Sequence, residues 1–473
     1  MRVRMCKSLL TSWFLMLVST VAIMAQELYT FSSLPFNTRE YDDYAASPYK
    51  NGLVFCSNRP QSALISRYDS AGKPLSDFYF AKKSKDGKWQ RNPDVFSKEL
   101  NSKYHEGPMT FIKDGTQIYF TLGDPSNEGI FISIFNSAEW GSIKPFQYNE
   151  TTSKSAQPCL SPDGTMLFFS SNRQGGNGKF DLYVCSKKDN QWSRPKNLGF
   201  RINSLADEKY PFYQNNKLYF ASNRSGGLGG FDIYFTKEIN GKWTVPILLP
   251  LPMNSLKDDF AYWSDSIDRH GYFSSDRSNR QKTTDIYEFS FNFPLLDSAK
   301  IQETNSYTYL LSEIRSINID TTTFKYEWEF GDGTKYLGKE LEIEHTYAST
   351  GDYIVKLNVI DSLTHEIQEN KSSFLIEARD VEQPFISCPD TTFVGKEISF
   401  DAIKTNLPNF SIANYYWDFG DNHIATGKEV KHVFTEPGVY KVIIGITSTP
   451  DANNQNRTEA RFRHVVIKNA SSP

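Results

Sequence analysis

Two features of this sequence could carry chemistry: a glycine-rich loop and neighbouring pairs of carboxylates. The loop lies in the stretch FASNRSGGLGGFDIYFTK, residues 220–237, with glycines at positions 226, 227, 229 and 230. Such a loop would hold a phosphate if it led from a strand into the N-terminus of a helix. No helical period follows it, and residues 231–236 predict another strand instead. The loop is therefore predicted to turn the chain between two strands.

The carboxylates recur as neighbours at equivalent places: Asp42 with Asp43, Asp207 with Glu208, and Asp258 with Asp259. Gathered at one face of a domain, such groups could hydrolyse glycosides. The alternative, which we favour, is an acidic turn residue that recurs because its structural unit recurs. The sequence also carries no Gly-x-Ser-x-Gly or His-Glu-x-x-His motif. We predict no catalytic residue, no enzyme activity and no cofactor.

The loop belongs to a repeat. Further copies are FSSNRQGGNGKFDLY at 169–183, FSSDRSNRQKTTDIY at 273–287, and weaker ones that begin near residues 55 and 120. Their leading phenylalanines are Phe55, Phe120, Phe169, Phe220 and Phe273, and an asparagine precedes each copy at Asn37, Asn101, Asn149, Asn203 and Asn254. A period near 50 residues of strands and turns is typical of four-stranded propeller blades. Residues 26–294 are predicted to form a β-propeller of about five blades.

Charged residues accompany the loop in three copies, as Arg173 with Asp181, Arg224 with Asp232, and Arg277 with Asp285. An arginine at the end of one strand and an aspartate at the start of the next could form a bidentate ion pair. We predict that each pair closes its hairpin. The alternative is a ring of acceptors at the channel mouth that binds a ligand or a cation.

These motifs resemble the TolB-like, WD-type propeller repeat of bacterial envelope proteins. The resemblance rests on SSNR-x-GG-x-GG-F-DIY followed by W-x-x-P-x-x-L, and it is good around residues 169 and 220, fair at 273 and weak at 120. It implies a propeller with a non-catalytic role at the cell envelope.

A second repeat follows residue 294. YEWEFGDG and GDYIVKLNV, between residues 326 and 359, are matched by YYWDFGDN and GVYKVIIGI between 415 and 446. A core tryptophan, a Gly-Asp turn and a later alternating strand predict a β-sandwich, with Trp328 and Tyr353 in one core and Trp417 and Tyr440 in the other. The motifs resemble PKD domains, which are immunoglobulin-like. We expect PKD domains at 295–379 and 380–473, and hence an all-β chain.

The acidic turn residues of these sandwiches raise the question of a metal. Some PKD domains bind calcium, so the resemblance implies a possible calcium ligand at Asp332 and at Asp421. The sequence lacks a dense run of oxygen ligands, and we predict no metal. His345 and His432 occupy equivalent places, about 87 residues apart. Each is expected to cap the core of its own sandwich rather than to share an ion.

The N-terminus predicts export. Arg2, Arg4 and Lys7 precede an apolar run that ends near Ala25, as in a cleaved signal peptide over residues 1–25. No later stretch is apolar enough to span a membrane. The net charge of −3 does not suggest nucleic-acid binding. The remaining cysteines are scattered, and we expect buried free thiols at Cys56, Cys159, Cys185 and Cys388.

These features fit three functions. The favoured one is a non-catalytic envelope scaffold or protein-interaction module, in the periplasm or at the outer membrane. The resemblance implies a role accessory to type IX secretion or gliding machinery, with envelope proteins as partners. The alternatives are a glycan-binding surface protein, which exposed aromatic side chains on a sandwich would favour, and a propeller hydrolase.

Overall fold

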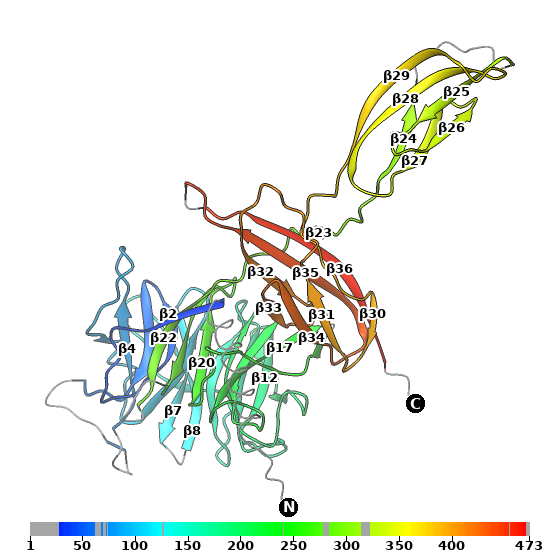
Figure 1. The fold of residues 1–473 in the computed structure, drawn as a ribbon. Coiled ribbons are helices and arrows are strands. Elements are labelled where there is room, and N and C mark those ends of the chain that lie inside the picture. The colour runs from blue at the N-terminus through cyan, green and yellow to red at the C-terminus, as the bar shows by residue number, and fades with distance from the viewer. Residues whose placement is uncertain are drawn as a thin grey trace, which may run out of the picture. The chain divides into compact units, whose positions relative to one another are not determined.

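A computed structural model describes residues 28–61, 68–69, 72, 74–124, 127–239, 241–277, 283–313, 322–453 and 455–469. Every regular element in these ranges is a β-strand, and no helix there is long and apolar enough to cross a membrane. The chain divides into two compact units, Met1–Phe293 and Pro294–Pro473 (Figure 1). The predicted signal peptide, residues 1–25, lies outside the described residues.

The described residues of the N-terminal unit form five antiparallel sheets, each made mainly of consecutive strands. The first two sheets contain β2 (Asp43–Tyr49), β3 (Gly52–Ser57), β4 (Asp77–Lys82) and β5 (Asp94–Val95), then β6 (His105–Phe111), β7 (Gln117–Asp124), β8 (Asn127–Ile134) and β9 (Lys144–Pro145). The third contains β10 (Ser155–Leu160), β11 (Met166–Ser171), β12 (Asp181–Lys188), β13 (Gln191–Trp192) and β14 (Lys196–Asn197). The fourth contains β15 (Glu208–Gln214), β16 (Lys217–Ser222), β17 (Asp232–Ile239), β18 (Lys242–Trp243) and β19 (Ile247–Leu248). The fifth contains β20 (Asp259–Ser264), β21 (His270–Ser275), β22 (Asp285–Phe291) and β1 (Tyr29–Ser33).

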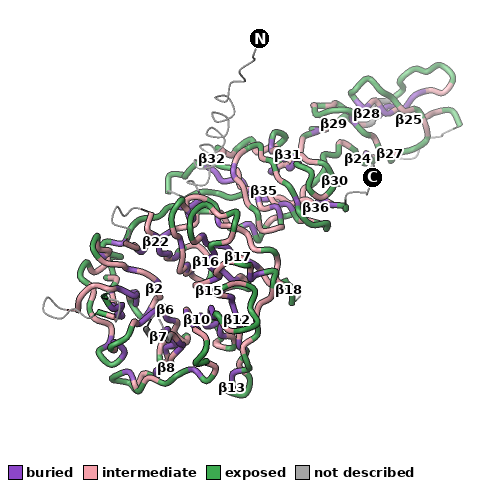
Figure 2. Tube along the Cα trace, turned by 90° about the horizontal axis from the view of Figure 1, so that it is seen from below, coloured by how far each residue is buried: buried purple, intermediate pink, exposed green. Residues whose placement is uncertain are grey.

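The five sheets are the blades of a propeller. The first strand of each blade contacts the first strands of its neighbours, so that β2, β6, β10, β15 and β20 form a closed circle. Figure 2 shows β2, β6, β10 and β15 around the middle of the unit. The last blade takes its outer strand from the other end of the unit: β1 pairs with β22, with Tyr29 opposite Phe291. This pairing closes the ring, because strands from both ends of the unit share one blade.

The five leading phenylalanines of the sequence repeat lie on the second strand of each blade. Their side chains are at most 1% exposed. Fully burying such a side chain stabilises a fold by roughly 1.5–3 kcal/mol. The repeat in the sequence is therefore a repeat in the core: one buried ring per blade, packed among the aromatic and aliphatic residues of the adjacent strands.

The five asparagines that precede the copies also have a common place. Each side chain both accepts from the N–H and donates to the C=O of one residue on the third strand of the preceding blade, with distances of 2.7–3.3 Å. The partners are Ile286, Phe78, Ile130, Leu182 and Ile233. The side-chain amide thus makes the two hydrogen bonds that the main chain of a neighbouring strand would make. It does so where the chain passes from one blade to the next.

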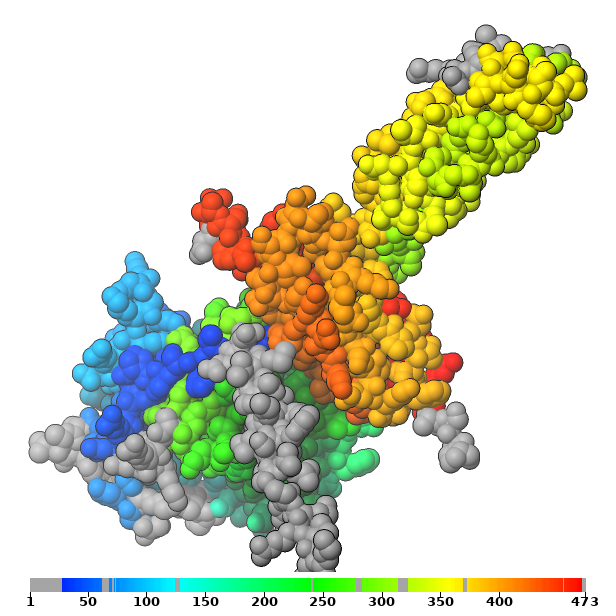
Figure 3. All heavy atoms as spheres, viewed as in Figure 1, coloured from blue at the N-terminus to red at the C-terminus, as the bar shows by residue number. Residues whose placement is uncertain are grey.

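The C-terminal unit contains two sandwiches. The first pairs β24 (Thr308–Ser312) with β27 (Glu342–Thr346), beside a sheet of β26 (Lys335–Gly338), β25 (Phe324–Glu329), β28 (Gly351–Asp361) and β29 (Ile367–Ala378). The second pairs β31 (Glu397–Asp401) with β34 (Glu429–Val433), beside a sheet of β30 (Thr391–Phe393), β36 (Thr458–Lys468), β35 (Gly438–Ser448), β32 (Ile412–Asp418) and β33 (Ile424–Thr426). In the space-filling view the first sandwich, coloured yellow-green to yellow, is an elongated body (Figure 3).

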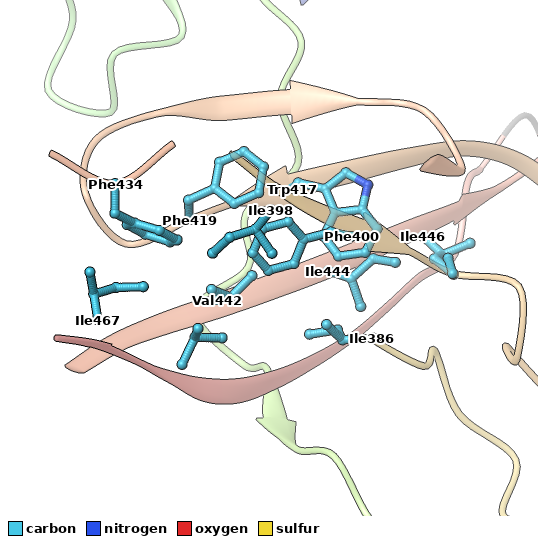
Figure 4. Close-up of a cluster of buried hydrophobic side chains, with 12 residues drawn as sticks. Ile386, Ile398, Phe400, Trp417, Phe419, Phe434, Val442, Ile444, Ile446 and Ile467 are labelled. Carbon is cyan, nitrogen blue, oxygen red and sulfur yellow. The ribbon is translucent and has the colours of Figure 1, made fainter. Parts of the chain in front are cut away.

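Each sandwich has a fully buried tryptophan. Trp328 and Trp417 are both 0% exposed, and their indole N–H groups donate to the carbonyls of Glu340 at 2.9 Å and Gly427 at 2.8 Å. Figure 4 shows Trp417 beside Phe400 within the second core. The two tyrosines expected in the cores are partly buried: Tyr353 stacks on Tyr347, and Tyr440 lies against Phe434. An all-β chain with a propeller followed by two immunoglobulin-like sandwiches is therefore confirmed.

The start of the first sandwich differs from the expected position of residue 295. A short strand, β23 (Lys300–Ile301), pairs in parallel with β36 and so extends the sheet of the second sandwich. Leu296 is 7% exposed and packs near Gly445. The chain therefore lies along the second sandwich before it enters the first. Such a pairing across more than 150 residues leaves no local signal in the sequence.

We predict that Asn254→Ala destabilises the propeller. Asn254 is 0% exposed, and its side chain binds Ile233 N–H, Ile233 C=O and the carbonyl of Leu249 at 2.7–2.9 Å. Each buried group left without a partner costs about 1–3 kcal/mol, so a loss of about 3 kcal/mol is expected in urea unfolding. The control is Asn51→Ala at an exposed position. Equal stability of the two variants would contradict this role.

Candidate functional site

A cavity lies in the middle of the propeller. It has a volume of about 660 Å³ and is lined by all five innermost strands and the turns that follow them. Its aromatic lining includes Phe111, Tyr210, Phe212 and Trp263. Its polar lining includes Ser47, Thr110, Gln157, Gln214 and Asp265. An aromatic wall with a few amide and hydroxyl groups suits an organic ligand that is both apolar and hydrogen-bonding.

Each innermost strand has a bulge where it meets the cavity. The register of its pairing shifts at the same place in all five blades. In four blades the residue in the bulge has a positive φ of 50–53°: Ala45, Gln157, Tyr210 and Ala261. This region is unfavourable for residues other than glycine, by roughly 1–2 kcal/mol each. In the second blade Pro108 stands at this position, and its ring restricts φ to negative values.

Hydrogen bonds between blades hold two of these bulges. The N–H of Ala45 donates to Ser274 Oγ at 3.0 Å, and the N–H of Gln157 donates to Thr121 Oγ1 at 2.8 Å. Pro108 has no N–H, and the residue at the matching position of the preceding blade is Cys56, which is buried. Hydroxyl groups on the second strands of neighbouring blades therefore hold two of the five bulges at the cavity wall.

The glycine-rich loops hold no phosphate-binding geometry. Asp232 accepts the N–H groups of Leu228 and Gly229 at 2.7 and 3.0 Å, and Asp181 accepts those of Asn177 and Gly178 at 2.6 and 2.8 Å. A carboxylate thus already occupies the place that an anion would take. A Cβ on Gly229 would lie 2.0 Å from the carbonyl oxygen of Lys257, in the next blade, so the glycine permits this close approach.

The sequence predicted that each arginine pairs with the aspartate on the other side of the hairpin. This predicted partner is wrong. Arg224 binds Glu208 at 3.0 Å, and Arg277 binds Asp259. Arg173 contacts Glu150 at 3.4 Å and the hydroxyl of Ser155 at 3.1 Å. The arginine side chain lies over a tyrosine ring of the third strand, but its hydrogen bonds go to the start of the innermost strand and not to the aspartate of the third strand. Arg224 also donates to the main-chain carbonyl of Ile202 at 2.6 Å.

The carboxylate pairs are explained by the same arrangement. The second acid of each pair is the arginine's partner and is 0% exposed: Asp43, Glu208 and Asp259. It also accepts the N–H of the residue after the repeated asparagine, which is Thr38, Ser204 or Ser255, at 2.6–2.9 Å. We call the acid, this N–H and the arginine the polar frame of a blade. The acids are held at the blade starts and are not gathered into a cluster.

The first acid of each pair lies outside the polar frame. The N–H groups of Asp42, Asp207 and Asp258 donate to Asn58, Asn223 and Asp276 at 2.7–2.9 Å. The carboxylate of Asp258 in turn accepts the N–H of Phe231 at 2.7 Å. These bonds connect consecutive turns at one end of the ring.

Two neighbouring blades have an incomplete polar frame. The third blade has Arg173 but carries Ser155 where the acid would be. The second blade has the acid, Glu106, but the equivalent of the arginine in its sequence is Asp124. Glu106 is 0% exposed, and its Oε2 has no hydrogen-bond partner among the described residues. Burial raises the pKa of Glu106 to about 8, the carboxyl of Asp77 adds to the rise, and bonds from Ser102 oppose it.

The acidic turns of the sandwiches bind histidine. Asp332 lies 2.8 Å from His345 Nε2, and Asp421 lies 2.6 Å from His432 Nε2. Burial opposes ionisation, but bonds from Thr334 and His345 lower the pKa of Asp332 to about 2. Each histidine stacks on the phenylalanine before its turn, Phe330 or Phe419. Each histidine therefore lies against the core of its own sandwich.

The thiols are buried in apolar surroundings. Cys56, Cys159 and Cys185 are buried, Cys388 is partly buried, and all four are free. Burial raises the pKa of the Cys159 and Cys185 thiols to about 12 and that of Cys388 to about 11. A thiol protonated at neutral pH is a poor nucleophile.

Sequence reasoning missed the cavity residues and the exceptional Glu106. A signal for Glu106 was present: the copy that begins at residue 120 reads FTLGD where the others read FSSNR or FASNR. The missing arginine marks the blade whose acid lacks a cation. No comparable signal exists for the cavity, because its lining depends on where five separate strands bulge.

Comparison with known proteins identifies a family match in the C-terminal region. The family model described as PKD domain matches residues 278–373 and 382–463. Collagenase ColA from Clostridium perfringens (strain 13 / Type A) is 38% identical over 85 residues, which make up 16% of this chain and 8% of the collagenase. The chain thus spans a small part of that curated relative.

Solved structures with a similar arrangement include a putative TolB from Agrobacterium tumefaciens, at 12% identity over 74% of this chain and 90% of that chain, with a TM-score of 0.33. Another is GH43B of Bacteroides ovatus, at 10% identity over 92% of each chain, with a TM-score of 0.36. These scores are too low to support a functional conclusion. The family match shows that the C-terminal region is of the PKD type. For the propeller, function is inferred from the geometry of its own residues.

We predict that Glu106→Gln removes a pH-dependent loss of stability. Between pH 4.5 and 8 the unfolded carboxyl is ionised while the folded one keeps its proton, so stability falls as pH rises through this window. The wild type should lose on the order of a few kcal/mol between pH 5 and 8 through this group, at about 1.4 kcal/mol per pKa unit. The variant should lose less, as measured by urea unfolding at both pH values.

The matched control is Glu208→Gln, in a blade with a complete polar frame. It leaves Arg224 without its anionic partner, and a loss of about 3 kcal/mol is expected at both pH values. If Glu106→Gln instead lowered stability as Glu208→Gln does, the two acids would be equivalent and the account of the second blade would be wrong.

Proposed function

We propose that this protein is an exported, non-catalytic interaction module whose protein partner docks on one end of the propeller. We call this end, where the innermost strands begin, the loop face. One observation carries the proposal: Phe200, Leu205 and Leu256 all belong to segments at the loop face and are 87%, 89% and 83% exposed. Large apolar side chains with this degree of exposure are typical anchors of protein interfaces.

The polar frame fixes the segments that carry these side chains. Leu205 follows Ser204, whose N–H and hydroxyl donate to Glu208 at 2.9 and 2.6 Å. Leu256 follows Ser255, which donates to Asp259 in the same way at 2.6 and 2.8 Å. Phe200 lies two residues before Ile202, whose carbonyl accepts from Arg224. An apolar side chain on a segment held this firmly can bind with a smaller loss of conformational entropy than one on a free loop.

The absence of catalysis is part of the proposal. Three of the recurring acids, Asp43, Glu208 and Asp259, each bind an arginine and a main-chain N–H group. Asp265 is the carboxylate in the cavity lining, and it accepts the N–H of Arg269 at 2.8 Å within a turn. A glycosidase needs two carboxyl groups on either side of the bond to be cleaved. The cavity lining offers one.

Export and an envelope location complete the proposal. They rest on the predicted signal peptide and on the resemblance of the propeller repeat to envelope proteins. In this setting the partner is another envelope protein. The proposed role is accessory to type IX secretion or gliding machinery.

The test is cross-linking in intact cells, followed by purification of the chain and mass spectrometry of its partners. We predict that replacing Phe200, Leu205 and Leu256 together with serine abolishes recovery of the main protein partner. The control replaces Ile134, Ile239 and Ile267 with serine, which are 54%, 53% and 59% exposed at the other end of the ring. Loss of the partner in the control alone would contradict docking on the loop face.

A second candidate function is glycan binding in the central cavity. Trp263, Tyr210 and Phe212 could stack on sugar rings, and Gln157 and Gln214 could bind hydroxyl groups. If this function holds, Trp263→Ala should abolish retention of the protein in affinity electrophoresis on soluble polysaccharides. Trp243→Ala, on an outer strand, should not. A wild-type protein that no polysaccharide retards would exclude this function.

A further inference from the structure

A cluster of possible metal ligands lies in the second sandwich, at the turn between β32 and β33. Asp421 Oδ2 is 2.6 Å from His432 Nε2, and Asp421 Oδ1 is 3.2 Å from His423 Nδ1. One ligand atom from each residue can be chosen so that all three lie within 4.8 Å of one another. The side chains of His432 and Asp421 are 10% and 14% exposed, whereas that of His423 is 44% exposed.

The surrounding structure fixes this cluster. The ring of His432 lies flat on Phe419, with centroids 4.1 Å apart and planes at 6°, and meets the edge of Phe434 at 4.6 Å. Asn422 has a φ of 78°, which bends the turn tightly and brings His423 back beside Asp421. The N–H of His423 also donates to Asp421 Oδ1 at 3.1 Å. The ligand atoms therefore converge without a change of the main chain.

The first sandwich has the same arrangement of aspartate, histidine and phenylalanine, but it lacks the second histidine. His345 contacts Asp332 at 2.8 Å and stacks on Phe330 with centroids 3.8 Å apart. Thr334 stands where the second sandwich has His423, and its hydroxyl donates to Asp332 Oδ1 at 2.6 Å. One histidine and one aspartate thus suffice for the packing role. His423 adds a nitrogen donor that this role does not require.

We infer that Asp421, His423 and His432 form a binding site for a divalent transition metal, with zinc as the ion that the donors suit best. Two imidazole nitrogens and one carboxylate oxygen are a common zinc set, and the remaining position can take water because His423 faces solvent. Calcium prefers six to eight oxygen ligands. The donors therefore distinguish this site from the calcium site considered for Asp421 on sequence alone.

Binding requires only a small adjustment. Zinc lies about 2.0–2.2 Å from such nitrogen and oxygen ligands, so tetrahedral ligand atoms are separated by roughly 3.3 Å. Asp421 Oδ1 already lies 3.2 Å from His423 Nδ1, whereas Asp421 Oδ2 lies 2.6 Å from His432 Nε2, so the carboxylate side chain must rotate to present one oxygen to the ion beside both nitrogens. On binding, each imidazole offers the lone pair of one nitrogen to the ion; a neutral ring keeps its one proton on the other nitrogen, and a protonated ring releases one proton to solvent.

The test is isothermal titration of the untagged full chain, treated with a chelator and dialysed, with zinc chloride and separately with calcium chloride. One zinc equivalent is expected. His423→Thr gives the second turn the residue of the first and should abolish that equivalent while the circular dichroism spectrum is unchanged. His464→Thr, at an exposed histidine of β36 outside the cluster, should retain it.

A cobalt titration provides a second readout. Cobalt bound by nitrogen and oxygen donors should give visible absorption bands in the wild type that are lost in His423→Thr. An unaltered zinc equivalent in His423→Thr, or no zinc equivalent in the wild type, would overturn the assignment. The result does not depend on whether a protein partner docks on the propeller.

Discussion

Three of the five blades depend on one buried interaction, made by the carboxylate that begins the innermost strand: Asp43, Glu208 or Asp259. This acid accepts a main-chain N–H from the segment that enters the blade and an arginine from the second strand. Removed from water, the acid and the arginine would each be costly alone. Held together, they fix the entering segment, the innermost strand and the end of the second strand at one point. In these blades the contacts hold the segments of the loop face in place.

The polar frame also explains why the glycine-rich loop is not a ligand site. The loop has its own carboxylate, Asp232, bound to two of its N–H groups. Burial raises the pKa of Asp232, and the two donors oppose the rise. Arg224, at the other side of the loop, binds Glu208 on the innermost strand instead. Two charged residues that are close in the sequence thus belong to different interactions, and neither is available to a phosphate.

Much of the fold could be predicted because it repeats. The leading phenylalanines and the preceding asparagines marked the blades, and Trp328 and Trp417 marked the two sandwiches. The arginine's partner could not be predicted, because two acids recur with the same period and spacing alone does not show which one lies beside it. The strand bulges at the cavity and the pairing of β23 with β36 depend on contacts between distant segments. The metal ligand His423 was missed because it occurs in only one of the two turns.

The central claim is that Arg224 stabilises the blade through Glu208 and not through Asp232. Two double-mutant cycles test it most directly, one with Arg224→Ala and Glu208→Ala, the other with Arg224→Ala and Asp232→Ala, each followed by urea unfolding. The account predicts a coupling energy of about 2 kcal/mol or more for the first cycle, and a value within about 0.5 kcal/mol of zero for the second. Strong coupling between Arg224 and Asp232, with none to Glu208, would contradict it.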